Sequence, residues 1–196
     1  MAKDDETPKT KDLGYNPKAA KWSILYRVRK TVWDIVNCTL FRFSPFFCYG
    51  WRRFLLRLFG ASISPTASIG RTAIINIPWN LTMDDNSMIC KNAWVMCSGK
   101  VSIGKNSMVG EYSKVLAGSH NSNSRTYSFV TPPIVIEDDC WIASGAMLVA
   151  GGKRPLKIGC GAIVGAGAVV FANVKSMTIV VGNPAEYLTD RVLSDE

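Results

Sequence analysis

Aliphatic side chains recur along this chain at a fixed interval of six residues. That interval fits neither the roughly 3.6-residue period of an amphipathic helix nor the simple alternation of a half-buried strand. A small residue follows most aliphatic positions four residues later, so each hexad would turn one bulky and one small side chain inward. We interpret each hexad as a short strand and a corner of a solenoid. The aliphatic positions form five triplets: Ile63, Ile69, Ile75; Met83, Ile89, Val95; Ile103, Val109, Val115; Ile136, Ile142, Leu148; and Ile158, Val164, Val170.

All irregularity in this spacing falls after the third hexad of a triplet. If three hexads form one triangular coil, every insertion leaves the solenoid at the same corner, and the insertions add 2, 2, 15 and 4 residues. The pattern predicts an all-β solenoid of about five coils over residues 61–182, with a long loop at 121–133. Stacked coils bury their apolar faces only against neighbours, so both ends need caps.

Glycine directly follows the aliphatic residue in five hexads. A residue without a side chain adopts unusual backbone angles at little cost, so we attribute these glycines to tight corners. They are Gly70, Gly104, Gly110, Gly159 and Gly165.

The segments outside the repeats predict helical caps. Residues 19–60 form an amphipathic helical segment that Gly60 ends. Residues 183–196 are expected to form a C-terminal helix, because Pro184 suits the first position of a helix. Residues 1–18 are polar, and we expect a disordered basic tail there.

The net charge of +8 is concentrated at the N-terminal end. Residues 1–60 hold 12 Lys and Arg against 5 Asp and Glu, whereas residues 61–196 hold 11 against 10. A basic segment rich in Trp, Phe and Arg suits an anionic membrane surface at least as well as a nucleic acid, and we expect no nucleic-acid partner. Two interpretations stay open for residues 19–60: peripheral contact with the inner face of a membrane, or capping of the first coil alone.

Six cysteines are scattered without a CxxC pair or a Cys/His metal spacing, and no metal is expected. We interpret them as free thiols, several at inward positions where cysteine behaves as a small apolar residue. The polar N-terminus lacks the apolar core of a signal peptide, and no stretch approaches the roughly 20 apolar residues that cross a bilayer. Together these features favour a reducing, cytoplasmic compartment.

Several further strings carry a family resemblance. They are residues 50–61 (GWRRFLLRLFGA), 78–81 (PWNL), 117–120 (AGSH), 133–136 (PIVI), 141–143 (WIA) and 181–185 (VGNPA). These strings resemble the hexapeptide-repeat acetyltransferases, in particular the branch of maltose, galactoside and colanic acid biosynthesis O-acetyltransferases. The resemblance covers about residues 50–191. It implies a left-handed parallel β-helix, a homotrimer, acetyl-CoA as co-substrate, and a saccharide or lipid-linked saccharide acceptor in polysaccharide biosynthesis.

His120 is the single histidine of the chain and precedes the long insertion. Acetyl transfer to an alcohol needs a base for the hydroxyl proton, and an imidazole, which is ordinarily neutral at pH 7, suits this task. The family keeps its base in the same Gly-Ser-His string, so the resemblance implies that His120 is the general base. A surface or packing role is the ordinary alternative. Asn121 replaces the acidic residue that often follows the histidine, which leaves Glu111 as a candidate to orient the imidazole, or as a solvated carboxylate.

The resemblance assigns the coenzyme to the coil after the insertion. Similar enzymes use backbone amides there around the thioester and its oxyanion. The matching residues are Trp141, Ala143, Ser144 and Gly145. Trp141 can equally pack against a neighbouring subunit. Lys153 and Arg154 are candidates for the coenzyme phosphates, or solvated charges, because Phe171, Ala172 and Glu186 replace residues that serve this purpose in similar enzymes.

The acceptor site departs from the family pattern. Cys90 stands where maltose-type enzymes place an acceptor-binding asparagine, and Asn92 follows two residues later. Arg125 and Tyr127 in the long loop are further candidates to bind the acceptor, unless the loop covers a subunit interface. These differences indicate acceptor contacts unlike those of the maltose-type enzymes.

The sequence therefore predicts an acetyl-CoA-dependent O-acetyltransferase that acts on a saccharide or glycolipid hydroxyl. Two alternatives stay open: an N-acetyltransferase on an amino sugar, and a trimeric scaffold without catalysis. A γ-type carbonic anhydrase shares the coil but needs three zinc-binding histidines, which a chain with one histidine cannot supply.

Overall fold

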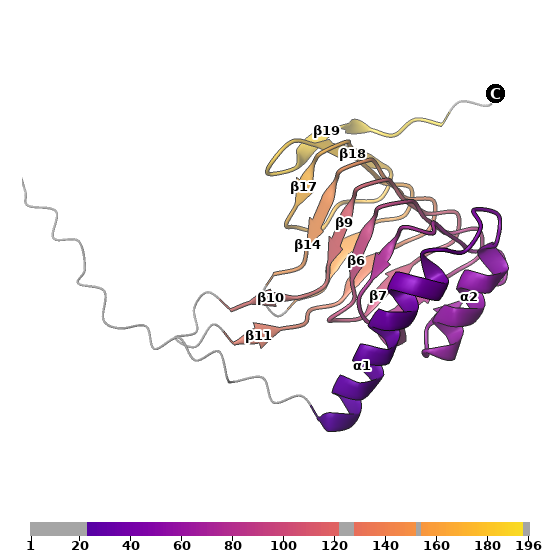
Figure 1. Ribbon diagram of the computed structural model, residues 1–196. Helices are drawn as coiled ribbons and strands as arrows, with labels where there is room; N and C mark the ends of the chain where they lie inside the picture. Colours follow the sequence, from indigo (N-terminus) through magenta and orange to yellow (C-terminus); the bar gives the residue numbers. More distant parts are fainter. Residues whose placement is uncertain (1–22, 122–127, 152–153, 194–196) are drawn as a thin grey trace, which may run out of the picture.

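The computed structural model describes residues 23–121, 128–151 and 154–193. Its body is a parallel β-solenoid with helices at the N-terminal end (Figure 1). The predicted solenoid with N-terminal helices is confirmed. The tail expected over residues 1–18 lies outside the described residues.

Three sheets form the sides of the solenoid, and each coil adds one strand to each sheet. The first sheet has the order β1 (Ser62–Ile63), β4 (Leu81–Met83), β7 (Val101–Ile103), β12 (Ile134–Ile136), β15 (Leu156–Ile158). The second sheet comprises β2 (Ser68–Ile69), β5 (Met88–Ile89), β8 (Met108–Val109), β13 (Trp141–Ile142), β16 (Ile163–Val164), β18 (Thr178–Val181) and β19 (Glu186–Asp190). The third sheet comprises β3 (Ile74–Ile75), β6 (Trp94–Met96), β9 (Lys114–Leu116), β14 (Met147–Val149) and β17 (Val169–Val170).

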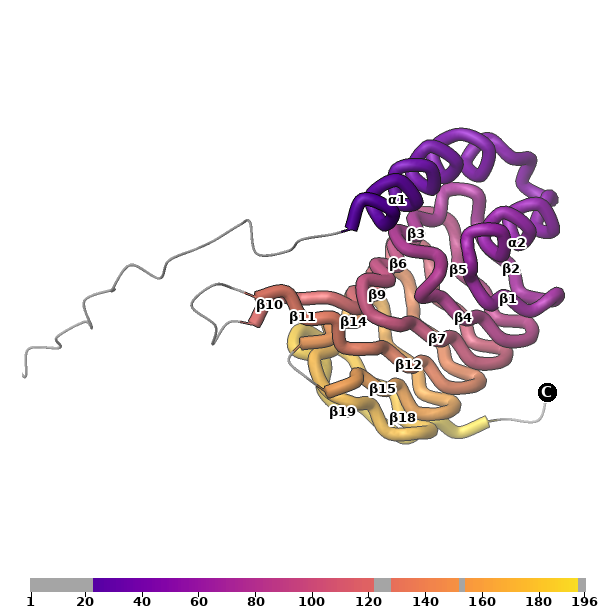
Figure 2. Tube along the Cα trace, turned by 90° about the horizontal axis from the view of Figure 1, so that it is seen from below, coloured from indigo at the N-terminus to yellow at the C-terminus, as the bar shows by residue number. Residues whose placement is uncertain are grey.

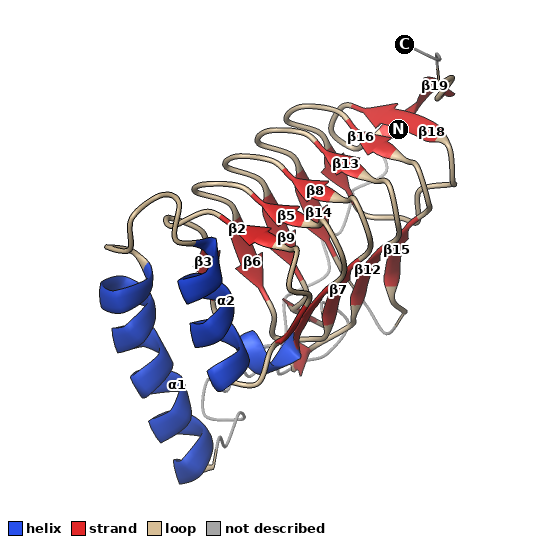
Figure 3. Cartoon of the chain, turned by 90° about the vertical axis from the view of Figure 1, so that its right-hand side faces the viewer, coloured by secondary structure: helices blue, strands red, loops and turns tan. Residues whose placement is uncertain are grey.

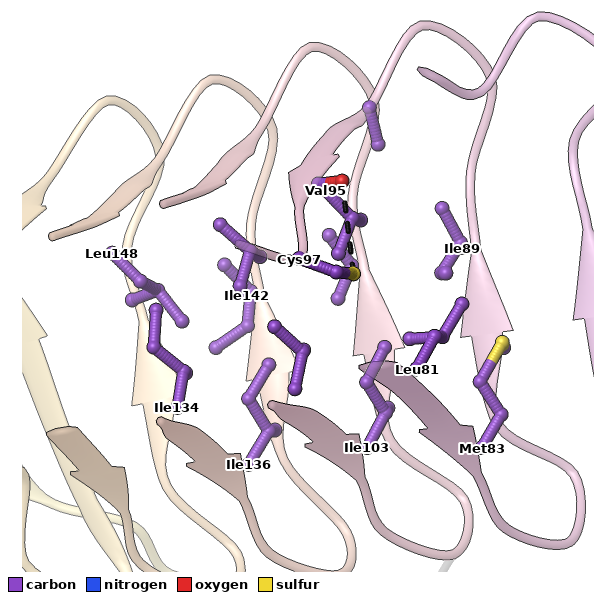
Figure 4. Packing of buried hydrophobic residues seen from close by; sticks show 14 of the residues in the cluster. Leu81, Met83, Ile89, Val95, Cys97, Ile103, Ile134, Ile136, Ile142 and Leu148 are labelled. Atoms are coloured by element: carbon purple, nitrogen blue, oxygen red, sulfur yellow. Dashed lines mark hydrogen bonds between the residues drawn. The ribbon is translucent and has the colours of Figure 1, made fainter. Parts of the chain in front are cut away.

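The aliphatic hexad positions form the core. All fifteen lie in these strands with at most 6% of their surface exposed, and like positions stack from coil to coil (Figure 4). On the first sheet, for example, Ile63 pairs with Met83 and Met83 with Ile103. The five triplets are five complete coils, and a sixth begins at Val174, which bridges to Ile158.

Two of the cysteines belong to this core. Cys97 and Cys140 are buried free thiols, in agreement with their inward sequence positions. Burial raises the pKa of the Cys140 thiol to about 11, so it stays neutral at pH 7. These cysteines therefore pack as small apolar side chains.

The corners take their shape from a different residue than the sequence suggested. Left-handed backbone angles occur at the third residue after the inward aliphatic one, as at Asn106 (φ 55°) and Gly145 (φ 72°). The glycines directly after the aliphatic residue have no such angles, so that explanation was wrong. They are needed for space: a Cβ on Gly104 would lie 2.6 Å from the carbonyl carbon of Glu137, and one on Gly110 would lie 2.7 Å from the Ile142 oxygen.

Two helices cover the N-terminal end of the solenoid. α1 (Ile24–Val36) continues into a π-helical turn, η1 (Asn37–Phe41), and α2 (Tyr49–Leu58) follows. Figure 2 shows α1 over β3 and α2 over β1 and β2, and Figure 3 shows both helices at one end of the coils.

The helical cap fills the hydrogen-bonding capacity of the first coil. This coil has no preceding coil to donate to its carbonyl groups, and side chains of the cap take that place. Trp33 donates to the Ile75 oxygen at 2.6 Å, and Arg52 donates to the Ile69 oxygen at 2.6 Å. Arg57 donates to Ile63. The described part of this segment therefore caps the first coil, and its contact with a membrane stays a prediction.

All insertions leave at the corner between the third and first sheets, as predicted. The first is a 3-10 turn, η2 (Pro78–Asn80). The long one carries a hairpin of β10 (Ser119–His120) and β11 (Phe129–Val130), which projects from the solenoid in Figure 1.

The predicted C-terminal helix over 183–196 is wrong for the described part of that range. The chain reverses through residues 182–185, and β19 pairs antiparallel with β18. β18 is the last parallel strand of its sheet, so its outer edge offers unpaired backbone groups that β19 satisfies. Arg191 then donates to the Asp139 and Gly161 oxygens, at 2.8 Å each, and ties the end of the chain to two corners.

Candidate active site

His120 lies on the hairpin that leaves the solenoid after β9. It is paired with Phe129 across the hairpin, and the two rings meet edge to face with their centroids 5.2 Å apart. The side chain of His120 is exposed. An imidazole held this way is accessible to a substrate from outside the chain.

Close packing at the base of the hairpin explains the small residue before Ser119 and His120. A Cβ on Gly118 would lie 2.9 Å from the Phe129 ring and 2.9 Å from the Ser98 side chain. The Asn121 N–H donates to the Ser128 oxygen at 2.9 Å, which closes the described part of the hairpin. Gly118 is thus required by the ring that packs against His120.

Four of the predicted coenzyme residues lie on another side of the solenoid. Trp141 is on β13 of the second sheet and is 46% exposed. Ala143, Ser144 and Gly145 follow at the corner between the second and third sheets.

Most amides of this group are already used by the fold. The Trp141, Ala143 and Gly145 N–H groups donate to oxygens of Ala162, Val164 and Glu111, at 3.0, 2.8 and 2.9 Å. Those three donors hold neighbouring coils together, so they are not free for an oxyanion. The Ser144 N–H makes no hydrogen bond to any described residue. Of the four predicted residues, Ser144 is therefore the one with a donor to offer.

Cys90 lines a cavity of about 260 Å³ between the helical cap and the second sheet. Burial, and then the Glu111 carboxylate, raise the pKa of its thiol, so Cys90 is a neutral group at pH 7. The other lining residues are Phe46, Tyr49, Arg52, Gly70, Arg71, Met88, Ile89, Lys91 and Glu111. A pocket with aromatic, basic and acidic groups around a neutral thiol suits a polar, partly apolar ligand.

A column of polar side chains beside Cys90 went unnoticed in the sequence. Arg71, Lys91, Glu111 and Ser144 each stand two residues after the inward aliphatic residue of the second sheet, in four successive coils. Comparing hexads position by position reveals this column. It joins the Cys90 pocket and the Ser144 amide along one corner.

Asn92, predicted as a second acceptor contact, has a structural reason for its identity. It holds a left-handed corner angle (φ 59°), which asparagine tolerates better than most residues, and its N–H donates to the Thr72 hydroxyl at 3.1 Å. It does not line the cavity with Cys90. Gly145 is explained by a corner angle in the same way.

The other predicted site residues are either exposed away from the cavity or outside the described residues. Arg154 is exposed at the corner between the third and first sheets. Arg125, Tyr127 and Lys153 lie outside the described residues. Within the part of the chain that the structure describes, no group of three or more His, Cys, Asp or Glu side chains is arranged to hold a metal ion.

The candidate residues therefore occupy two different corners of one chain. His120 projects where the third sheet leads to the first, whereas Cys90, Glu111 and Ser144 follow strands of the second sheet. Glu111 and His120 in one chain are accordingly at different corners.

Comparisons with known proteins agree with this fold. No protein-family model matches the chain. Over 165 residues the chain is 34% identical to the "Putative colanic acid biosynthesis acetyltransferase WcaF" of Escherichia coli K12, covering 84% of this chain and 88% of the relative. A hexapeptide-repeat acetyltransferase from Vibrio cholerae, solved with acetyl-CoA, has a TM-score of 0.73 at 22% identity over 86% of this chain and 90% of that one. A galactoside acetyltransferase solved with coenzyme A has a TM-score of 0.77 at 16% identity, over 87% and 84% of the two chains. The chain thus belongs to the hexapeptide-repeat acetyltransferases.

Proposed function

We propose that this protein transfers an acetyl group from acetyl-CoA to a hydroxyl of a saccharide or glycolipid in polysaccharide biosynthesis, in the cytoplasm. The observation that carries the proposal is the exposed His120 on its hairpin, in a chain 34% identical to a protein named for colanic acid biosynthesis. The acetyl-CoA and coenzyme A bound to the two structural relatives support the choice of donor.

His120 acts as the general base in this proposal. It takes the proton of the acceptor hydroxyl while the oxygen attacks the thioester carbonyl carbon. The tetrahedral intermediate collapses with cleavage of the C–S bond, and the proton passes to the departing thiolate. The Ser144 N–H is the donor that we assign to the oxyanion.

The site is completed by a second copy of the chain in a homotrimer. His120 and the corner of Cys90 and Ser144 belong to different corners of one solenoid, so they act on one substrate when two copies lie side by side. The exposed Trp141 is an apolar surface suited to that contact. In such a site Glu111 of one copy would orient His120 of the next.

The Cys90 cavity is our candidate for the acceptor. Arg71, Lys91 and Glu111 offer hydrogen-bonding groups for a sugar, and Tyr49 offers a ring for its apolar face. A hydroxyl acceptor is our first choice over an amine because one relative is named for colanic acid biosynthesis and one structural relative is a galactoside acetyltransferase.

Replacement of the single histidine tests the proposal. The His120→Ala and His120→Asn variants should lower kcat by about 10²- to 10⁴-fold with soluble acceptor sugars and acetyl-CoA. Undiminished turnover in both variants excludes His120 as the base.

The alternatives have their own measurements. Faster acetylation of amino sugars than of the matching hydroxyl sugars would favour N-acetyl transfer. Calorimetry of the wild-type protein with acetyl-CoA separates an enzyme from a scaffold, since absence of binding would favour a trimer without catalysis.

A further inference from the structure

The helical cap turns an apolar face away from the solenoid. α1 carries a row of five aliphatic side chains, 45% to 81% exposed, over roughly 100° of its circumference. We name this row the outer stripe; it consists of Ile24, Leu25, Val28, Val32 and Ile35. Trp33, on the opposite side of the helix, is the residue that packs inward. Helix α1 is therefore amphipathic with its aliphatic side toward solvent, the reverse of an ordinary surface helix.

Exposed aromatic rings extend this apolar surface beyond α1. Phe43, Phe46 and Phe47 between the two helices are 66% to 80% exposed, and we name them the aromatic elbow. Within the described residues neither helix has the length and apolar character needed to cross a membrane. An apolar face of this kind suits a helix that lies on a membrane surface.

The charge of the cap is positive and largely uncompensated. Described residues 23–60 contain seven Lys and Arg but only one carboxylate, Asp34, which pairs with Lys30 at 2.6 Å. The arginines that hold the cap in place donate to backbone oxygens, as Arg53 does to Ala67, so their charge is not neutralised. Helix geometry puts Arg27 on one edge of the outer stripe. Arg29, on the other edge, donates to the Phe59 oxygen at 2.7 Å and lies over the Trp79 ring, so it belongs to the packing of the cap.

We propose that the outer stripe and the aromatic elbow dock this protein on the surface of an anionic phospholipid bilayer. The apolar side chains enter the interfacial region, and Arg27 lies at the level of the phosphate groups. A second copy of the cap is a poorer occupant, because it would bring two positively charged surfaces together. Phe46 also lines the Cys90 cavity, so docking would bring that cavity close to the bilayer.

This last consequence rests on the proposed function and favours an acceptor carried on a lipid. The docking proposal itself does not rest on it. Vesicle binding is measured without acetyl-CoA or acceptor, so failure of docking and failure of acetyl transfer are distinguishable.

Vesicle sedimentation of the full chain tests the docking. Wild-type protein should bind vesicles of phosphatidylcholine with about 30% phosphatidylglycerol far more than phosphatidylcholine alone, and added salt should weaken this binding. A Leu25→Gln, Val28→Gln, Val32→Gln variant should bind about tenfold more weakly, since glutamine keeps the helix and removes the apolar contact. The matched control, Val192→Gln with Leu193→Gln, changes two exposed side chains at the opposite end and should bind like wild type.

Three results would overturn the proposal. They are absence of wild-type binding to anionic vesicles, equal binding of the triple variant and wild type, and equal loss in the control variant. Light scattering identifies the competing occupant. If the oligomer of the triple variant dissociates and the wild-type protein does not bind vesicles, the outer stripe is a contact between copies of the chain.

Discussion

Single positions of the hexad have separate physical tasks in this solenoid. The aliphatic residue fills the core, and the residue directly after it faces the backbone of the following coil. The residue three positions after the aliphatic one takes the left-handed angle. Gly104 performs the second task and Asn106 the third. A sequence reveals that glycine is favoured at a position, but it does not reveal whether space or backbone angle is the reason.

Two glycine substitutions separate close approach from simple flexibility. Gly104→Ala should destabilise the protein by about 2 kcal/mol, because the new methyl group would meet the backbone of Glu137. Gly50→Ala in α2 should stabilise it by about 0.5 to 1 kcal/mol, because its Cβ would have only an ordinary 3.7 Å contact with Arg53. Urea unfolding of both variants measures the two effects. Equal stability of Gly104→Ala and wild type would mean that the coils can move apart at little cost.

The sequence indicated the candidate site residues to different degrees, because one residue type can be present for chemistry or for the shape of a corner. His120 could be singled out as a candidate because it combines a reactive side chain with the single long insertion and with the Gly-Ser-His string of the family. Asn92 has a structural reason for its identity, a corner angle, and its contact with the acceptor stays a prediction. The pocket around Cys90 was not predictable, because its walls come from a helix and from coils whose contacts no local pattern encodes.

At the scale of elements, the unpaired strands at the two ends of the solenoid determine which structure the flanking segments adopt. The repeats predicted the five complete coils, because a periodic core repeats one physical constraint, but they did not predict the sixth coil that begins at Val174. The C-terminal segment was predicted as a helix from Pro184, yet the free edge of β18 takes residues 186–190 as a strand. Tertiary hydrogen bonding outweighed local preference there.

The N-terminal cap depends on one buried cation. Arg52 has no exposed surface and donates to the Ile69, Pro45 and Phe46 oxygens and to the Ser44 hydroxyl. Arg52→Met should therefore destabilise the protein by about 3 kcal/mol, because it leaves several buried acceptors without a donor. Arg57→Met is the matched control: the Arg57 side chain is exposed and, among the described residues, bonds only to the Ile63 oxygen, so a loss of about 1 kcal/mol is expected.

Thermal or urea unfolding compares these variants. Equal losses for Arg52→Met and Arg57→Met would contradict the assignment of Arg52 as the anchor of the cap. Loss of helical circular dichroism before the main transition in Arg52→Met would show that the cap detaches first.

At the scale of the whole molecule, the described chain presents its candidate chemistry on two separate corners. A solenoid has no internal cleft, because each coil fills its own interior with the hexad side chains. A reaction centre must then form on its outside. The exposed Trp141 and the hairpin of His120 are both on that outer surface.

Mixed oligomers provide the decisive measurement of this arrangement. His120→Ala removes the proposed base, and Cys90→Trp fills the cavity of about 260 Å³. Each variant alone should be inactive. Co-expressed in equal amounts, they should regain about a quarter of wild-type activity, since about one site in four would pair an intact hairpin with an intact pocket. A double variant carrying both changes, co-expressed with wild type, has the same number of altered residues. This mixture should also give about a quarter of wild-type activity, because one pair in four consists of two wild-type copies and every mixed pair lacks either the hairpin or the pocket. About a quarter of wild-type activity in both mixtures would locate the site between copies. No activity with the separate variants, together with about half in the mixture of double variant and wild type, would confine the site to one chain.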